Sequence, residues 1–90
     1  MASATVTIVN RLGLHARPAM AFVQRANAFA ATIRVRRSDS TEEVDGKSIM
    51  QMLLLAGTTG TELVITAQGA DETLALAALV ELVAGRFDED

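Results

Sequence analysis

The chain has 90 residues, a formal net charge of −3, no cysteine, and three aromatic residues, all of them phenylalanine. This length predicts a single domain over residues 1–90. The lack of cysteine excludes disulfides, thiolate catalysis and cysteine-based zinc sites, and the low aromatic content argues against a base-stacking nucleic-acid site.

The charges are unevenly distributed along the chain. Residues 1–38 contain six arginines and no acidic residue. Residues 39–90 contain all eleven acidic residues and only two basic ones, Lys47 and Arg86. This asymmetry favours an anion or an acidic partner near the first half, unless folding interleaves the two halves. The longest apolar run, 74–80, is too short to span a bilayer, and the N-terminus lacks a signal-peptide pattern. We therefore expect a cytoplasmic protein with no membrane insertion.

The first half predicts a strand, a helix and two more strands. Residues 4–9 alternate, with Val6 and Ile8 on the buried face, and 10–15 form a loop. A helix should begin near Pro18, which fits a first turn. Its core-facing stripe comprises Ala19, Phe22, Val23, Ala26 and Phe29. A second strand follows over 32–37, then a turn at 38–40 and a weaker strand over 41–45.

The second half predicts a helix, a strand and a helix. Ser48 and Gln51 match a capping box, in which the hydroxyl accepts from the Gln51 amide and the glutamine reaches back. It predicts a helix over 49–56 that Gly57 closes. A strand is expected over 61–68, and a helix over 72–84, capped by Asp71 and ended by Gly85. The order β-α-β-β-α-β-α indicates an α+β fold with a mostly antiparallel sheet and helices on one face.

The candidate reactive residue is His15, the only histidine, where the first loop enters the helix. Helix starts present unpaired N–H groups and partial positive charge, and Arg17 can add a bidentate bond to a phosphate. The same field disfavours protonated imidazole, and small Ala16 and Ala19 leave room for a donor. These features indicate reversible phosphoryl acceptance at nitrogen, although capping or a surface role also suits such a histidine. Neither a metal site nor a hydrolytic triad is expected.

Two motifs resemble those of the histidine-containing phosphocarrier (HPr) family. Gly13-Leu14-His15-Ala16-Arg17-Pro18-Ala19 resembles its active-site signature, and Gly46-Lys47-Ser48-Ile49-Met50 its regulatory-serine motif. The resemblance covers the whole chain and implies an open-faced β-sandwich, with a four-stranded antiparallel sheet and three helices. It also implies a carrier in the phosphoenolpyruvate-dependent phosphotransferase system, rather than a turnover enzyme, without a cofactor. Enzyme I would phosphorylate the histidine and an enzyme IIA domain would accept the group. The acidic end and the alanine-rich last helix resemble the nitrogen-related NPr branch.

The resemblance assigns roles to particular residues. His15 would accept the phosphoryl group through Nδ1, and Arg17 with the backbone N–H groups of Ala16 and Arg17 would hold it. Partner docking would involve Met20, Ile49, Met50 and Leu53, although core packing explains Ile49 and Leu53 equally well. In part of the family a serine kinase modifies the residue matching Ser48, but Gln51 replaces the glycine common after Ser-Ile-Met. A monomer is expected.

Two alternatives remain open. A regulatory module that docks proteins through the Ser48 face would carry no phosphoryl group, and labelling of His15 would distinguish it from a carrier. A nucleic-acid-binding domain would use Arg34, Arg36 and Arg37. The low aromatic content and negative charge argue against that second alternative, and a solvated strand face explains these arginines more simply.

Overall fold

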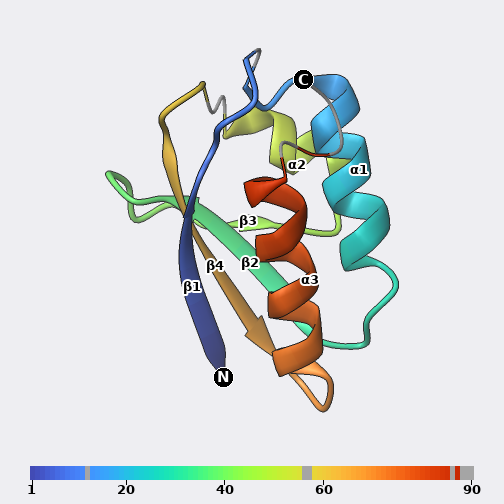
Figure 1. Ribbon diagram of the computed structural model, residues 1–90. Coiled ribbons are helices and arrows are strands. Elements are labelled where there is room, and N and C mark those ends of the chain that lie inside the picture. Colours follow the sequence, from blue (N-terminus) through green and yellow to red (C-terminus); the bar gives the residue numbers. More distant parts are fainter. Residues whose placement is uncertain (12, 56–57, 86, 88–90) are drawn as a thin grey trace.

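One four-stranded antiparallel sheet carries three helices on one of its faces (Figure 1). The computed structural model describes residues 1–11, 13–55, 58–85 and 87. The elements are β1 (Ala2–Thr7), α1 (Ala16–Ala26), β2 (Thr32–Arg37), β3 (Val44–Asp45), α2 (Ile49–Leu54), β4 (Glu62–Gln68) and α3 (Glu72–Ala84). The predicted element order and fold class are therefore confirmed.

The strand order β1-β4-β2-β3 places β4 between β1 and β2. Its register pairs Ile65 with Ala4 on one side and with Val35 on the other. Alternate residues of the strands turn toward the helices and are buried, whereas their neighbours lie on the open face. The buried set comprises Val6, Ile33, Val35, Leu63, Ile65 and Ala67. The alternation in the sequence predicted this face correctly.

The helices complete the core above the sheet. The fully buried side chains of Phe22 from α1, Met52 from α2 and Leu79 from α3 belong to the same cluster as the inward strand residues. Helices α1 and α2 are neighbours: Asn27, after the end of α1, donates through Nδ2 to the Lys47 carbonyl oxygen before the start of α2, at 3.3 Å. The start of α2 therefore lies beside the end of α1.

Several element boundaries differ from the sequence prediction, among them the start of β4, which lies at Glu62 instead of residue 61. Strand β1 is shifted two residues toward the N-terminus, although Ile8 still bonds to the 60–61 backbone beyond it. Strand β3 covers only Val44–Asp45, because the Glu42 amide donates to Ser40 Oγ (3.1 Å) instead of to a strand. Helix α1 ends at Ala26, so Phe29 lies beyond it and is half-buried.

Only one of the two predicted capping hydrogen bonds forms at the start of α2. Ser48 Oγ accepts from the Gln51 amide at 3.3 Å, which confirms the serine cap. Gln51 does not reach back to Ser48: its Oε1 accepts from the Asp45 amide at 2.8 Å, while the Ser48 amide donates to the Asp45 carbonyl oxygen. Helix α2 ends at Leu54, with Leu55 as its C-cap, two residues before the predicted end; residues 56 and 57 themselves lie outside the described residues.

Asp71 occupies the N-cap position of α3, as predicted, but its side chain does not cap the helix. The Asp71 carboxylate accepts instead from the amides of Ala30 and Ala31, at 2.8 Å each, and makes no capping bond. The bond from Ala30 is the largest effect lowering the pKa of Asp71, and the Ala31 bond acts in the same direction. Gly85 ends α3 as expected, since its amide bonds to the Glu81 carbonyl oxygen.

Lys47 also binds the segment that connects α1 and β2, which the Asp71 carboxylate contacts. Its Nζ donates to the carbonyl oxygen of Phe29 at 2.7 Å. Together with the Asp71 carboxylate, this bond fixes residues 29–31 against the segments that precede α2 and α3.

In the described part of the chain, no helix has the length and apolar character needed to cross a membrane.

Candidate functional site

His15 stands at the N-cap of α1, at the end of a hydrogen-bonded loop. The buried Asn10 donates through Nδ2 to the Gly13 carbonyl oxygen at 2.6 Å, and the Gly13 amide returns a bond to the Asn10 carbonyl oxygen at 3.2 Å. Gly13 has φ +71°, a left-handed conformation that glycine adopts without a steric penalty. The His15 amide then bonds to the Gly13 carbonyl oxygen at 3.1 Å. This loop sets where the histidine enters the helix.

A second loop, which contains Thr59 and Gly60 and is distant in sequence, holds the first loop in place. The Thr59 hydroxyl lies 2.5 Å from the Asn10 carbonyl oxygen and 2.8 Å from that of Arg11, so it can donate to either. The Gly60 amide bonds to the Ile8 carbonyl oxygen at 2.8 Å. Sequence reasoning missed the positioning roles of Asn10 and Thr59. Only the Asn10–Gly13 spacing, typical of a side-chain-supported turn, carried any local signal.

The first turn of α1 offers two backbone donors beside His15. The first helical hydrogen bond runs from the Ala19 amide to the His15 carbonyl oxygen at 3.0 Å, so the amides of Ala16 and Arg17 precede it. Pro18 is the third helical residue and has no N–H. The turn contains no acidic residue, and both Ala16 and Arg17 are exposed. A positively charged, accessible helix start therefore adjoins the histidine.

Ala19 does not contribute space to this site. Its side chain is fully buried in the hydrophobic core, so the expectation that it leaves room for a donor is wrong. Ala16, by contrast, is exposed beside His15, as expected. The correction has a simple cause: residue 19 lies one helical turn after His15 and faces the sheet, as the core stripe of α1 requires.

The residues matched to partner docking have different environments. Met20, Met50 and Leu53 are 49%, 76% and 41% exposed, although all three are apolar. Ile49 is half-buried and packs against the core. Leu54, which sequence reasoning missed, is 77% exposed. We call Met20, Met50, Leu53 and Leu54 the apolar docking surface; its residues lie on the neighbouring helices α1 and α2.

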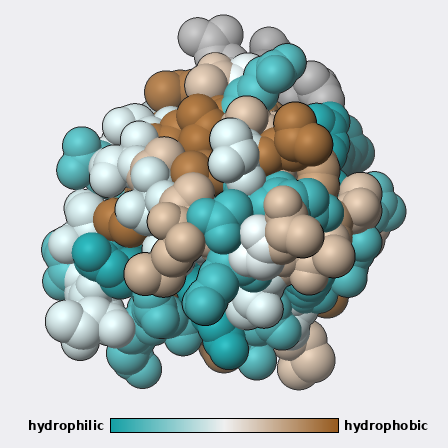
Figure 2. Space-filling view, turned by 90° about the horizontal axis from the view of Figure 1, so that it is seen from below, coloured by the Kyte–Doolittle hydropathy of each residue, from teal (hydrophilic) through white to brown (hydrophobic). Residues whose placement is uncertain are grey.

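The end of the molecule opposite the His15 loop has a different character. Figure 2 shows it as a mainly hydrophilic face with hydrophobic side chains at several places, most of them in the upper half of the view. Among the described residues, no three histidine or acidic side chains gather as a metal site would require. His15 and Arg17 lie at the start of α1, and the apolar docking surface lies on α1 and α2.

Ser48 is not beside His15. It is half-buried at the start of α2, next to the end of α1, whereas His15 lies at the start of α1. The 11 residues of α1 separate the two, a length of about 16 Å. A modification of Ser48 would therefore act at the start of α2 rather than on the histidine ring.

The arginines of β2 are not a uniform solvated face. Arg34 is exposed, as expected, but Arg36 Nη1 bonds to the carbonyl oxygens of Arg37 and Ser40, at 3.3 and 3.1 Å. Arg37 binds Asp39 through two nitrogens, at 3.1 and 3.0 Å. Two of the three arginines therefore hold the loop that follows β2.

Comparisons with known proteins agree with this geometry. Residues 2–85 match the family model for the "PTS HPr component phosphorylation site". The phosphocarrier protein HPr of Pseudomonas aeruginosa is 47% identical over 99% of this chain and 98% of its own length. The phosphocarrier protein NPr of Proteus mirabilis is 40% identical, covering 94% of this chain and 93% of its own. Among solved structures, HPr-C-His from Thermoanaerobacter tengcongensis superposes with a TM-score of 0.92 at 40% identity, covering 100% and 99% of the two chains.

Proposed function

Because the chain belongs to the HPr family of phosphocarrier proteins of the phosphotransferase system, we propose that His15 accepts a phosphoryl group from enzyme I and passes it to an enzyme IIA domain. The observation that carries this proposal is the position of His15 at an acid-free helix start, beside two backbone donors and the exposed Arg17. NPr as well as HPr relatives match, so the proposal covers both the sugar-transport and the nitrogen-regulatory branch.

The proposed chemistry is a transfer of the phosphoryl group between nucleophiles. His15 Nδ1 attacks the phosphorus, the bond from phosphorus to the donor breaks, and the donor leaves with that electron pair. The amides of Ala16 and Arg17 and the Arg17 guanidinium then hold the phosphoryl oxygens. Transfer to the acceptor repeats the step in the opposite sense, so the protein returns unchanged.

The apolar docking surface would bind both partners, one after the other. Exposed methionines suit such a surface, because their flexible thioethers adapt to different shapes. Half-buried Ile49 would act mainly by supporting the docking surface from the core side. We propose that the protein works as a cytoplasmic monomer, since a carrier must expose the same surface alternately to donor and acceptor.

Ser48 would provide a point of regulation where a serine kinase is present. A phosphate there adds a charge of about −1.5 to −2 next to Ile49 and Met50, which would weaken binding of an acidic partner. Its oxygens can still accept from the Gln51 amide, which Ser48 Oγ contacts at 3.3 Å. The helix cap and the modification are therefore compatible.

The test is incubation with enzyme I and radiolabelled phosphoenolpyruvate. We expect one acid-labile, alkali-stable phosphate per chain, and none in His15→Ala, because His15 is the only histidine. Label that persists in His15→Ala would overturn the assignment of the residue. A chain that takes up no label but still binds protein partners would support the alternative of a regulatory binding module.

A further inference from the structure

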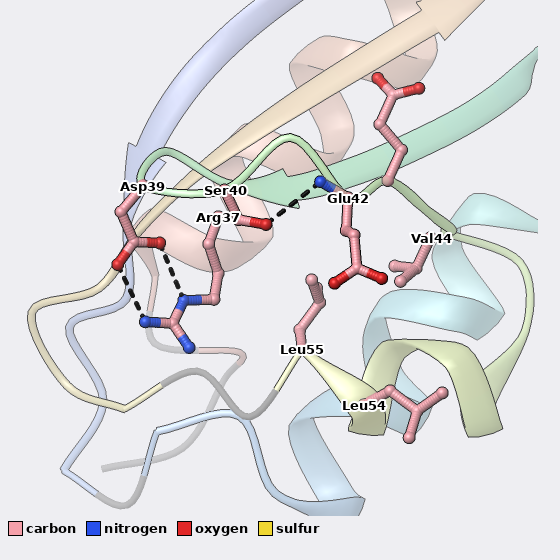
Figure 3. Close-up of a pocket in the computed structure, with 8 residues that line it drawn as sticks. Arg37, Asp39, Ser40, Glu42, Val44, Leu54 and Leu55 are labelled. Atoms are coloured by element: carbon pink, nitrogen blue, oxygen red, sulfur yellow. Dashed lines mark hydrogen bonds and ion pairs between the residues drawn. The ribbon is translucent and has the colours of Figure 1, made fainter.

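A pocket of about 370 Å³ lies between the 38–43 loop and the end of α2, away from His15. Its walls combine aliphatic and charged side chains. Val44, Leu54 and the buried Leu55 form the aliphatic part, and Arg37, Asp39, Glu42 and Glu43 supply the charges. In Figure 3 the Glu42 carboxylate and the Leu55 side chain point toward one another, and the Arg37–Asp39 pair lies on the opposite side.

The loop that forms one wall is fixed in place before any ligand arrives. Arg37 binds Asp39 through two hydrogen bonds, and Arg36 holds the carbonyl oxygens of residues 37 and 40. The Glu42 amide bonds to Ser40 Oγ, as the dashed line in Figure 3 marks. A wall held by this many bonds loses little freedom on binding, which favours recognition of a specific group.

The pocket has an excess of negative charge. One arginine faces three carboxylates, and that arginine is already paired with Asp39. Glu42 and Glu43 are both exposed, and in the described part of the chain neither carboxylate forms a hydrogen bond or an ion pair. The Glu42 carboxylate beside an aliphatic wall, with a second acidic residue next to it in the loop, complements a cation carried on an aliphatic chain.

We propose that this pocket receives a lysine or arginine side chain of a docking partner. The inference rests on the proposed function, because Leu54 belongs both to the pocket and to the apolar docking surface. A protein that covers Leu53 and Leu54 would thus have its own side chains next to the pocket. Its aliphatic stem would lie on Leu54 and Leu55, and its charge would face Glu42.

The consequence is a docking face with opposite charges at two places. Arg17, at the start of α1, attracts acidic groups, while the pocket beyond the end of α2 attracts basic ones. A partner with only an acidic surface would satisfy the first region and leave the second empty. The pocket therefore fixes the orientation of a bound partner and selects those with a basic residue at the matching position.

The first test uses a small probe and does not depend on phosphoryl transfer. N-acetyl-arginine amide is titrated into the isotopically labelled protein, and N-acetyl-citrulline amide is the uncharged control. We expect amide shifts at Val44, Leu55 and the 38–43 loop with the first probe, at least about twofold smaller with the second or in Glu42→Gln. Glu81→Gln, which removes one exposed charge on α3, should leave them unchanged. Equal shifts with both probes, or binding of free spermidine but not the arginine amide, would overturn the inference.

The second test measures partner recognition in the full transfer reaction. Glu42→Lys should raise the KM of enzyme I or of the enzyme IIA domain for this protein about threefold at low salt, with less effect at high salt. The final amount of label on His15 should stay the same, and Glu81→Lys should change neither quantity. A KM unaffected with both partners would refute the docking role while label on His15 still upheld the carrier function. Failure of labelling in every variant would instead refute the carrier function, and the probe titration would then still decide whether the pocket takes a cationic side chain.

Discussion

Gly46 precedes the start of α2 at a position where an added methyl group has no space. A Cβ built there lies 2.5 Å from Ile33 Cγ2, 3.1 Å from Ile33 Cβ and 3.3 Å from Phe22 Cε1. Carbon atoms pack best at about 3.5–4.0 Å, so Gly46→Ala requires a displacement of about 1 Å. Ile33 and Phe22 are fully buried, and the Gly46 amide is bonded to the Ile33 carbonyl oxygen at 2.9 Å. Neither the backbone nor its neighbours can move freely.

We expect Gly46→Ala to destabilise the fold by about 1–3 kcal/mol, as overpacking of a filled core does. For a domain of this size each kcal/mol lowers Tm by about 4–8 °C, so a cost near the middle of that range corresponds to about 8–16 °C. Thermal unfolding followed by circular dichroism measures the shift, and urea unfolding gives the free energy.

A double-mutant cycle with Ile33→Ala tests the steric reason. Ile33→Ala alone should cost about 2–5 kcal/mol by leaving a cavity, and it also removes the Cγ2 atom that the new methyl group approaches. The double variant should therefore be more stable than the sum of the single costs predicts. If the two costs add within about 0.5 kcal/mol, the contact with Ile33 is not the cause and the reasoning is wrong.

Three further predictions concern Arg17, Ser48 and Asp71. Arg17→Ala should slow phosphorylation by enzyme I about 10- to 100-fold, the effect of one charge-assisted hydrogen bond, without changing Tm; a lowered Tm would show that Arg17 is structural. Ser48→Ala should lose its bond to the Gln51 amide and about 1 kcal/mol in urea unfolding, whereas Ser48→Asp should retain most of that stability, and equal losses in both would contradict the cap. Because the folded-state pKa of Asp71 is lowered, its ionised form stabilises the fold above the ordinary value of 3.8, and this stability is lost as the pH falls through the folded pKa. Asp71→Asn should therefore lower Tm at neutral pH, and its difference from the unmodified chain should shrink in acid; a difference independent of pH would refute this role.

Sequence patterns predicted the features that depend on neighbouring residues. The alternation at Leu63, Ile65 and Ala67 identified a buried face, and Ser48 was correctly placed as a cap. Pro18 correctly indicated a helix start. Each of these depends on the local period of a strand or helix, or on a hydrogen bond within one turn, and such signals lie within a few residues.

Features that depend on distant residues were missed or assigned to the wrong partner. Asp71 has the composition of a helix cap, yet its carboxylate binds amides about 40 positions earlier in the chain. Gln51 likewise binds Asp45, across the turn before α2. Thr59 braces a loop 48 positions away, and no local pattern indicates that contact. In each case the tertiary fold offered a donor or acceptor that competed successfully with the local one.

Pro18 has a further consequence for the energetics of transfer. With a proline as the third residue of α1, the helix start presents the amides of Ala16 and Arg17 and no third one. In the proposed carrier, another amide on the phosphoryl oxygens would add about 1.5–3 kcal/mol to the stability of the phosphorylated form. That would lower the equilibrium constant for phosphoryl transfer to the acceptor by about 10- to 100-fold. The protein would then retain the phosphoryl group instead of passing it on. In the proposed carrier, the missing N–H would therefore keep the transfer potential of a phosphorylated His15 high enough for the phosphoryl group to pass to the acceptor.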